Sequence, residues 1–153
     1  GDPIPNAGSG RRAAGYRVQA QCLAHSAEVA EAGGVSLVLE THGNFRAFDA
    51  GEVMFQAGYP VALMVNWHLG HCLRHGEDVD EAYRHVKGRV GHCHFAIGED
   101  KAEPAHLHRQ ARLLADEGFD GFFSVEVINP DNGEQALGQH VRFWKEVKAG
   151  LGG

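Results

Sequence analysis

The sequence predicts an α/β fold in which four parallel strands alternate with helices, equivalent to the C-terminal half of a (β/α)8 TIM barrel. Apolar runs of strand length alternate with longer segments of helical spacing along the 153 residues. The apolar runs show little polar alternation, which is typical of parallel strands covered on both faces. Each run also ends on a Glu or a His, and a barrel is the parallel fold that brings successive strand ends to one centre.

The first half of the sequence contains two predicted helices, each followed by a predicted strand. Residues 11–32 have apolar side chains at helical spacing, and Gly33-Gly34 is typical of a helix end. The run at residues 35–39 is almost continuously apolar, which predicts a buried strand. The pattern then repeats, with a helix predicted at residues 47–57 and a strand at residues 61–65.

The second half begins with residues 66–71, which are predicted to form a loop rich in functional side chains. The remaining predicted elements are helices at residues 77–87, 104–117 and 134–148 and strands at residues 90–95 and 122–127. Pro104 suits the first turn of its helix, because the amide hydrogen that proline lacks has no partner there. Strands and helices in this order pair in parallel through right-handed crossovers.

Residues 1–153 are predicted to form one partial domain. A complete barrel needs eight strands and about 250 residues, so four strands correspond to its second half. The sequence begins with Gly rather than Met, and residues 1–10 are rich in turn-forming residues. We therefore expect residues 1–10 to be a loop that leaves an upstream part of a longer protein, with about 100 residues and the N-terminal strands of the barrel absent.

Composition disfavours several classes of partner. The net charge is -6, and the longest cluster of basic residues is Arg11-Arg12, which argues against nucleic acids and anionic membranes. No apolar run approaches the ~20 residues that span a bilayer. Three widely spaced cysteines without a Cys-x-x-Cys motif predict free thiols and a cytoplasmic protein, with Cys22 and Cys93 buried.

The four predicted strands each deliver a candidate metal ligand at or near the C-terminal end: Glu40, His68, His94 and Glu126. Successive candidates are about one βα unit apart, the ~30 residues that bring one strand next to another. Taken singly, each residue has an ordinary structural explanation, such as an ion pair or a place in a loop. Together they predict a metal site, and strand alternation places His92 on the same face as His94, with Cys93 opposite.

The predicted site can carry out proton transfer next to a carbonyl. Mixed carboxylate and imidazole ligands suit Mn²⁺, which we expect, and also Co²⁺, Zn²⁺, Fe²⁺ or Mg²⁺. A divalent metal stabilises the enediolate formed when a carboxylate removes the proton α to the carbonyl of a hydroxyketone. With Glu40 and Glu126 as the two catalytic carboxylates, such a site would serve an aldose–ketose isomerase or a ketose epimerase.

Five short motifs carry a resemblance to a known family: LVLETHG at residues 37–43, VNWHLGH at 65–71, GHCH at 91–94, GFDG at 118–121 and SVEV at 124–127. Over essentially its whole length the sequence resembles the C-terminal half of the xylose isomerase-like TIM-barrel superfamily, the sugar phosphate isomerases and epimerases. The resemblance implies a metal held by Glu, Asp, His and Glu from the last four strands, with both glutamates acting as acid and base. By position it assigns Glu40, His94 and Glu126 to those roles and His71 to substrate contact.

Two positions depart from the family pattern. His68 stands where the family has Asp, which removes one negative charge from the site. The family's epimerases carry a basic residue about six positions after the ligand His, where this sequence has Asp100 followed by Lys101. His42 and His92 are either pocket residues that contact the substrate or structural histidines. Arg46 is a candidate contact for a phosphate or carboxylate of the substrate, although we expect it to be a solvated loop residue.

Other interpretations of the sequence remain open. A dehydratase or lyase on the same scaffold would use a similar enolate, whereas a DNA-repair nuclease of the superfamily needs additional metal ligands and a basic groove. The expected partner is a small sugar or sugar acid. An inactive fragment or degenerate homologue is the alternative from a different class, since a half-barrel exposes two sheet edges and is expected to aggregate or to form a homo-oligomer.

Overall fold

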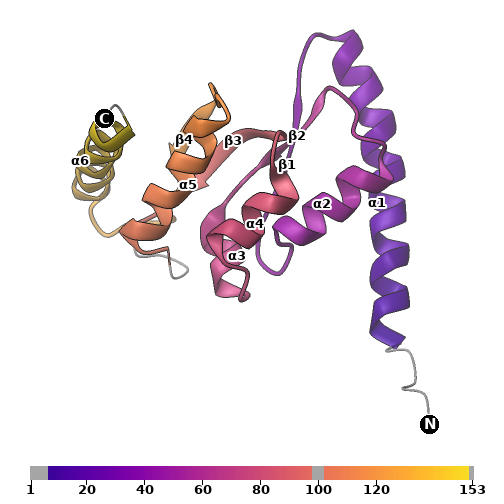
Figure 1. Cartoon of the computed structure of the whole chain (residues 1–153), viewed down its shortest axis with the longest axis horizontal. Coiled ribbons are helices and arrows are strands. Elements are labelled where there is room, and N and C mark those ends of the chain that lie inside the picture. The colour runs from indigo at the N-terminus through magenta and orange to yellow at the C-terminus, as the bar shows by residue number, and fades with distance from the viewer. Residues whose placement is uncertain (1–6, 98–101, 152–153) are drawn as a thin grey trace.

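The computed structural model describes residues 7–97 and 102–151, and in them helices alternate with parallel strands as predicted (Figure 1). The elements in chain order are α1 (Ala7–Ala32), β1 (Leu37–Glu40), α2 (Ala47–Gln56), β2 (Leu63–Asn66), α3 (Leu69–Arg74), α4 (Val79–Val86), β3 (Val90–Phe95), α5 (Pro104–Asp116), β4 (Phe122–Val125) and α6 (Gly133–Leu151).

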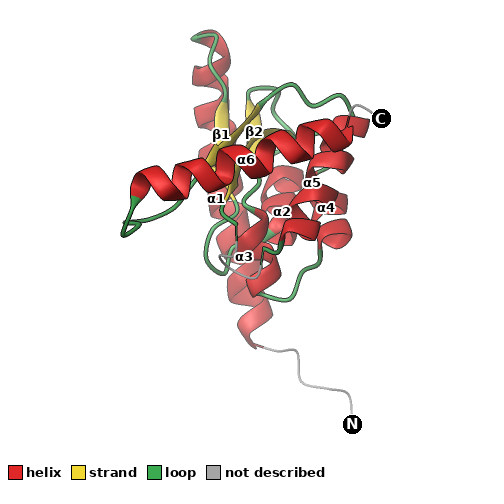
Figure 2. Cartoon of the chain, turned by 90° about the vertical axis from the view of Figure 1, so that its left-hand side faces the viewer, coloured by secondary structure: helices red, strands yellow, loops and turns green. Residues whose placement is uncertain are grey.

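The strands form a single four-stranded sheet in the order β1-β2-β3-β4, and every neighbouring pair is parallel. Leu37 lies opposite Leu63 at one end of the first pair, and Glu40 lies opposite Asn66 at the other. Figure 1 shows the helices following one another from α1 to α6 at the opposite end of the molecule. After a 90° turn, α6 crosses the view in front of the sheet (Figure 2). This arrangement is one half of a (β/α)8 barrel.

Several predicted boundaries were wrong. Of the loop predicted at residues 1–10, residues 1–6 lie outside the described part of the chain, and residues 7–10 belong to α1. The first strand begins at Leu37 rather than Val35, because the Val35 amide donates to the Ala30 carbonyl and so completes the end of α1. Gly34, with a φ of 66°, makes this turn without the strain that a side chain would add. At the other end of the chain, α6 continues to Leu151.

The segment at residues 66–71 is only partly a loop. Helix α3 begins at Leu69, with His68 in the extended conformation of an N-cap residue. Leu69 and Cys72 are fully buried, so the short helix is held by packing of its apolar face rather than by its length.

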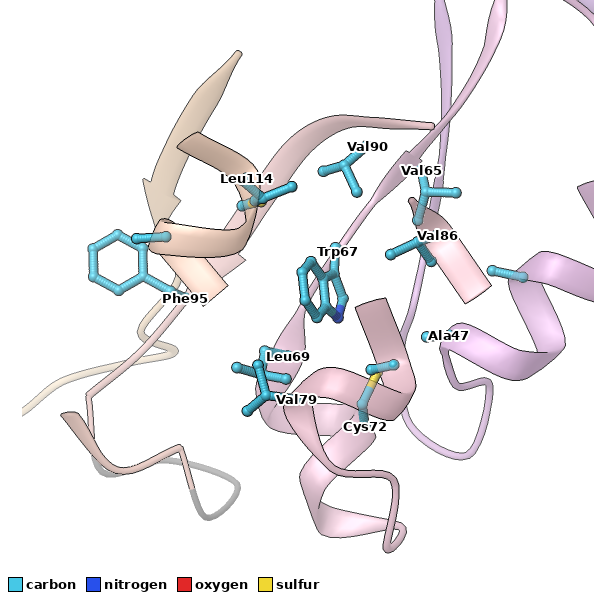
Figure 3. Close-up of a cluster of buried hydrophobic side chains, with 14 of the residues drawn as sticks. Ala47, Val65, Trp67, Leu69, Cys72, Val79, Val86, Val90, Phe95 and Leu114 are labelled. Carbon is cyan, nitrogen blue, oxygen red and sulfur yellow. The ribbon is translucent and has the colours of Figure 1, made fainter. Parts of the chain in front are cut away.

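The core lies between the sheet and its helices. Trp67, Leu69, Val65 and Val86 are almost inaccessible to solvent and lie together between the end of β2 and helices α3 and α4 (Figure 3). Within the described residues no helix is long and apolar enough to span a membrane. Cys93 is buried, as predicted, whereas Cys22 is exposed on α1, which corrects the expectation that it is buried.

A buried carboxylate holds the N-terminus of α2. Glu77 is 2% exposed, and its two oxygens accept hydrogen bonds from the Ala47 and Phe48 amides, each 2.9 Å away. Amides of a first helical turn have no partner within the helix, so the carboxylate satisfies two of them and offsets the positive end of the helix dipole. The same charge, after burial itself, helps to raise the pKa of the Cys72 thiol to about 12.

We expect Glu77→Gln to lower the free energy of unfolding by about 2 kcal/mol, since the amide group leaves one buried helix amide unpaired. Urea unfolding at a fixed protein concentration measures the effect. The control is Glu31→Gln, which makes the same chemical change at an exposed position on α1 and should stay within ~0.5 kcal/mol of the wild type. Equal effects of the two substitutions would contradict the capping role of Glu77.

Candidate metal centre

Four side chains from the four strands converge at the C-terminal edge of the sheet. Glu40, His68, His94 and Glu126 each offer one ligand atom, and these four atoms lie within 4.8 Å of one another. The Nδ1 atom of His94 is 2.7 Å from Glu40 Oε1 and 3.1 Å from Glu126 Oε2. The Nδ1 atom of His68 is 3.1 Å from the same oxygen of Glu126 and 3.9 Å from Glu40 Oε1. The structure thus brings all four predicted ligand residues together.

The parallel sheet explains this convergence. Glu40 is the last residue of β1, His94 lies near the end of β3, and Glu126 directly follows β4. The Glu126 amide still donates to the Phe95 carbonyl, so its backbone position is fixed by strand pairing. His68 lies two residues beyond β2, at the start of α3. Parallel strands point the same way, and their carboxyl ends therefore share one edge.

The donor set suits a divalent transition metal. Two carboxylates and two neutral imidazoles carry a charge of about -2, and mixed oxygen and nitrogen ligands are those of Mn²⁺, Fe²⁺, Co²⁺ and Zn²⁺. The Oε2 atom of Glu126 is buried and accepts no hydrogen bond from any described residue, although two ring nitrogens lie 3.1 Å away. A buried carboxylate oxygen normally accepts a hydrogen bond, so a buried Glu126 Oε2 without one fits the role of a metal ligand.

Three further histidines surround the four. His71, on α3, is largely buried, and its ring centre lies 4.3 Å from that of His68 and 4.4 Å from that of the exposed His42. His92 shares a face of β3 with His94, their ring centres being 5.2 Å apart, whereas Cys93 points into the core as predicted. Burial and the neighbouring charge of His94 lower the pKa of His92, against a smaller opposing effect of Glu40. A neutral His92 can accept a hydrogen bond from a hydroxyl group.

Arg46 forms an ion pair outside the group of four candidate ligands. Its Nε atom lies 3.4 Å from Asp49 Oδ2, and the same carboxylate oxygen accepts a hydrogen bond from the Arg46 amide. Asp49 is buried and also contacts Arg12 at 2.9 Å. Arg46 therefore belongs to an ion pair at the start of α2 rather than to solvent. Asp100 and Lys101, the other position that sequence reasoning considered for charged substrates, lie outside the described residues.

Two residues that sequence reasoning missed hold the backbone at His68, one of the four candidate ligands. The Thr41 hydroxyl accepts a hydrogen bond from the His68 amide at 2.9 Å and donates to the His68 carbonyl at 3.2 Å. Gln110, fully buried on α5, donates to the carbonyl of Trp67, the residue before His68. Thr41 could have been identified from the sequence, because it directly follows the candidate ligand Glu40. No neighbouring residue in the sequence indicates a role for Gln110.

The fold agrees with comparisons to known proteins. Residues 3–147 match the family described as xylose isomerase-like TIM barrel. No curated protein matches the sequence significantly. Among solved structures, 3-keto-D-glucoside 4-epimerase from E. coli superposes with a TM-score of 0.71 at 15% identity, covering 94% of this chain and 57% of that one. An L-ribulose 3-epimerase superposes with a TM-score of 0.64 at 21% identity, covering 94% and 49%.

The chain therefore spans about half the length of these two structures, and their likeness at such low identity establishes the fold. The match of the family description to nearly the entire sequence establishes the relationship. This chain belongs to the xylose isomerase-like TIM barrel family.

Proposed function

We propose that this chain carries the catalytic centre of a divalent-metal-dependent sugar isomerase or epimerase, which moves a proton at the carbon α to a carbonyl. The observation that carries the proposal is the pair of carboxylates, Glu40 and Glu126, which meet two imidazoles at one point on the C-terminal edge of the sheet. The two relatives of similar fold are both sugar epimerases by name, which supports the same class of reaction.

Glu40, His68, His94 and Glu126 would hold the metal, with Mn²⁺ as the preferred ion and Co²⁺, Zn²⁺, Fe²⁺ or Mg²⁺ as alternatives. A divalent ion held by these residues would supply Lewis-acid chemistry, polarising the substrate carbonyl and stabilising the negative charge on its oxygen. His68 in place of a carboxylate leaves the site with less negative charge and favours the transition ions over Mg²⁺.

Each glutamate has one oxygen at the centre and a second one available for proton transfer. Glu40 directs Oε1 and Glu126 directs Oε2 toward the imidazoles, which leaves Glu40 Oε2 and Glu126 Oε1. Because β1 and β4 are the two outer strands of the sheet, the carboxylates approach the centre from different sides. One glutamate can remove the proton from one face of the substrate carbon while the other returns a proton to the opposite face.

The substrate in this proposal is a small keto sugar or sugar acid, with His71, His42 and His92 as contacts for its hydroxyl groups. Imidazoles donate and accept hydrogen bonds, which suits a ligand covered with hydroxyls. The free thiols of Cys72 and Cys93 support a reducing, cytoplasmic location. Nucleic acids are not expected partners at a net charge of -6.

Hydrogen exchange in D₂O tests the proposed reaction with any sugar that loses its α proton at the site. A panel of ketopentoses, ketohexoses and keto sugar acids is incubated with the protein and Mn²⁺, and mass spectrometry and NMR follow deuterium at the α carbon. We expect incorporation together with the epimer or isomer, at least ~10²-fold slower after treatment with EDTA and restored by Mn²⁺.

Loss of water from the sugar instead of epimerisation would identify the lyase reaction of the same scaffold. Exchange that is insensitive to EDTA would contradict the metal dependence. No exchange with any sugar of the panel, in a protein that binds Mn²⁺, would overturn the proposed function while leaving the metal centre in place.

A further inference from the structure

We propose that Gln110, on α5, is a positioning residue for the metal centre, which holds the chain beside both imidazole ligands so that the two rings can bind one ion. The side-chain amide of Gln110 donates to Trp67 and to Cys93, the residues directly before His68 and His94. It therefore acts through the neighbours of the ligands. The role rests on the proposed function, because it concerns how tightly the divalent ion of that function is bound.

Gln110 occupies a position at which the helix pattern favours an apolar residue. The buried face of α5 consists of four residues at helical spacing: Leu107, Gln110, Ala111 and Leu114. The other three belong to the hydrophobic core. Gln110 is fully buried, and its Oε1 atom accepts no hydrogen bond from any described residue. A buried amide oxygen without a partner lowers stability, and residues kept at such a cost are expected at functional sites.

The amide group of Gln110 fixes one end of the peptide unit between Trp67 and His68. Its Nε2 atom donates to the Trp67 carbonyl at 3.2 Å. The other end of the same peptide unit is the His68 amide, which donates to Thr41 Oγ1 at 2.9 Å. A peptide unit is planar, so hydrogen bonds at its oxygen and at its nitrogen leave it little freedom to rotate. The side chain of His68 starts from this plane, and the direction of its imidazole is thereby fixed.

The same nitrogen of Gln110 reaches the strand that carries His94. It lies 3.9 Å from Cys93 Sγ, which is a weak acceptor. Burial raises the pKa of the Cys93 thiol, so the thiol stays protonated near neutral pH and this contact is not an ion pair. Trp67 is tied to the same strand, because its amide donates to the His92 carbonyl at 2.9 Å. Gln110 therefore joins, from the helix side of the sheet, the two segments that carry the imidazole ligands.

One ion can bind both imidazoles only if the rings keep one mutual distance and angle. The Nδ1 atoms of His68 and His94 each lie 3.1 Å from the same oxygen of Glu126. Without Gln110, the backbone before each ring can take up further orientations in the metal-free protein. Metal binding must then restrict these orientations, which weakens affinity.

Isothermal titration of Gln110→Leu with Mn²⁺ tests this role, since leucine removes both hydrogen bonds and suits the apolar core. We expect Mn²⁺ to bind about 10-fold more weakly, at the lower end of the losses caused by replacing groups that orient metal ligands. In the metal-free variant, the His68 amide should exchange with D₂O at least ~10-fold faster than in the wild type, because its peptide unit is held at one end only.

Urea unfolding of the metal-free protein separates positioning from a merely structural role. The midpoint of Gln110→Leu should be no lower than that of the wild type, since removal of the unpaired Oε1 atom offsets the lost hydrogen bond. Leu107→Ala is the control on the same buried face of α5, where Leu107 is 4% exposed. It should lower the midpoint by leaving a cavity, but weaken Mn²⁺ binding less than Gln110→Leu does.

Wild-type affinity for Mn²⁺ in Gln110→Leu would overturn the positioning role and leave the proposed function standing. An equal loss of affinity in Leu107→Ala would do the same, because it would trace the effect to destabilised packing. Exchange of the His68 amide at the wild-type rate would also contradict the role. A wild-type protein that binds no Mn²⁺ would refute the proposed metal dependence, and the role of Gln110 with it.

Discussion

Replacing Glu126 with glutamine is expected to lower the rate of epimerisation by at least ~10³-fold. General acid–base catalysis contributes about 10²–10⁴-fold, and an amide cannot exchange a proton with carbon in place of the carboxylate. The assay is carried out at a metal concentration shown by titration to saturate the variant, so that weaker metal binding does not account for the loss. Circular dichroism should be unchanged, because Glu126 is partly exposed and lies beyond the last residue of β4.

Glu40→Gln is the matched variant, and deuterium exchange separates the roles of the two carboxylates. With Glu126 replaced, Glu40 can still remove and return a proton on its own face of the substrate carbon. We therefore expect the Glu126 variant to exchange deuterium into one epimer without inverting it, and the Glu40 variant to do the same with the other epimer. Epimerisation at the wild-type rate in either variant would contradict the two-carboxylate mechanism, and exchange into the same epimer in both would point to a third residue as the base.

The sequence was a good guide to the fold because each strand carries its own signal. The runs around Leu39 and Val65 show little polar alternation, which is typical of strands in a parallel sheet. Parallel strands have their carboxyl ends at the same edge of a sheet, so Glu40, His94 and Glu126, which lie at or next to those ends, lie near one another. The spacing of these residues in the sequence was therefore enough to predict that they lie close together in the fold.

The features that the sequence did not predict correctly have a common physical origin. Val35 is as apolar as its strand neighbours, but its amide completes the end of α1, which is a contact between neighbouring elements. Leu69 to Arg74 is too short to show a helical period, and its burial against the core decides its conformation. Gln110 supports the His68 segment from α5, more than forty positions away in the chain. The period of apolar residues indicates which face of a helix or strand is buried. The strand boundary at Val35, the conformation of α3 and the role of Gln110 depend instead on contacts with other elements.

Replacing His94 with alanine is expected to weaken Mn²⁺ binding by at least ~10²-fold. Its Nδ1 atom lies within 3.1 Å of one oxygen from each glutamate, so it is the donor closest to both carboxylates. Substitutions of groups that only orient metal ligands reduce affinity by about 10–100-fold, and loss of a ligand itself should cost at least as much. Isothermal titration calorimetry with Mn²⁺ and Zn²⁺ measures the change directly and needs no substrate.

The control and a gain-of-affinity variant make the metal prediction specific. His92→Ala removes an imidazole from the same strand face, with its ring centre 5.2 Å from that of His94 but outside the four-residue group, and should weaken Mn²⁺ binding less than His94→Ala does. His68→Asp adds a negative charge and a hard oxygen donor, so Mg²⁺ and Mn²⁺ should bind more tightly relative to Zn²⁺.

If His94→Ala binds Mn²⁺ as the wild type does, or if His92→Ala weakens Mn²⁺ binding more than His94→Ala, then the ion is held elsewhere. In that case the convergence of the four side chains has another cause, namely the hydrogen bond between His94 and Glu40 that the structure already contains.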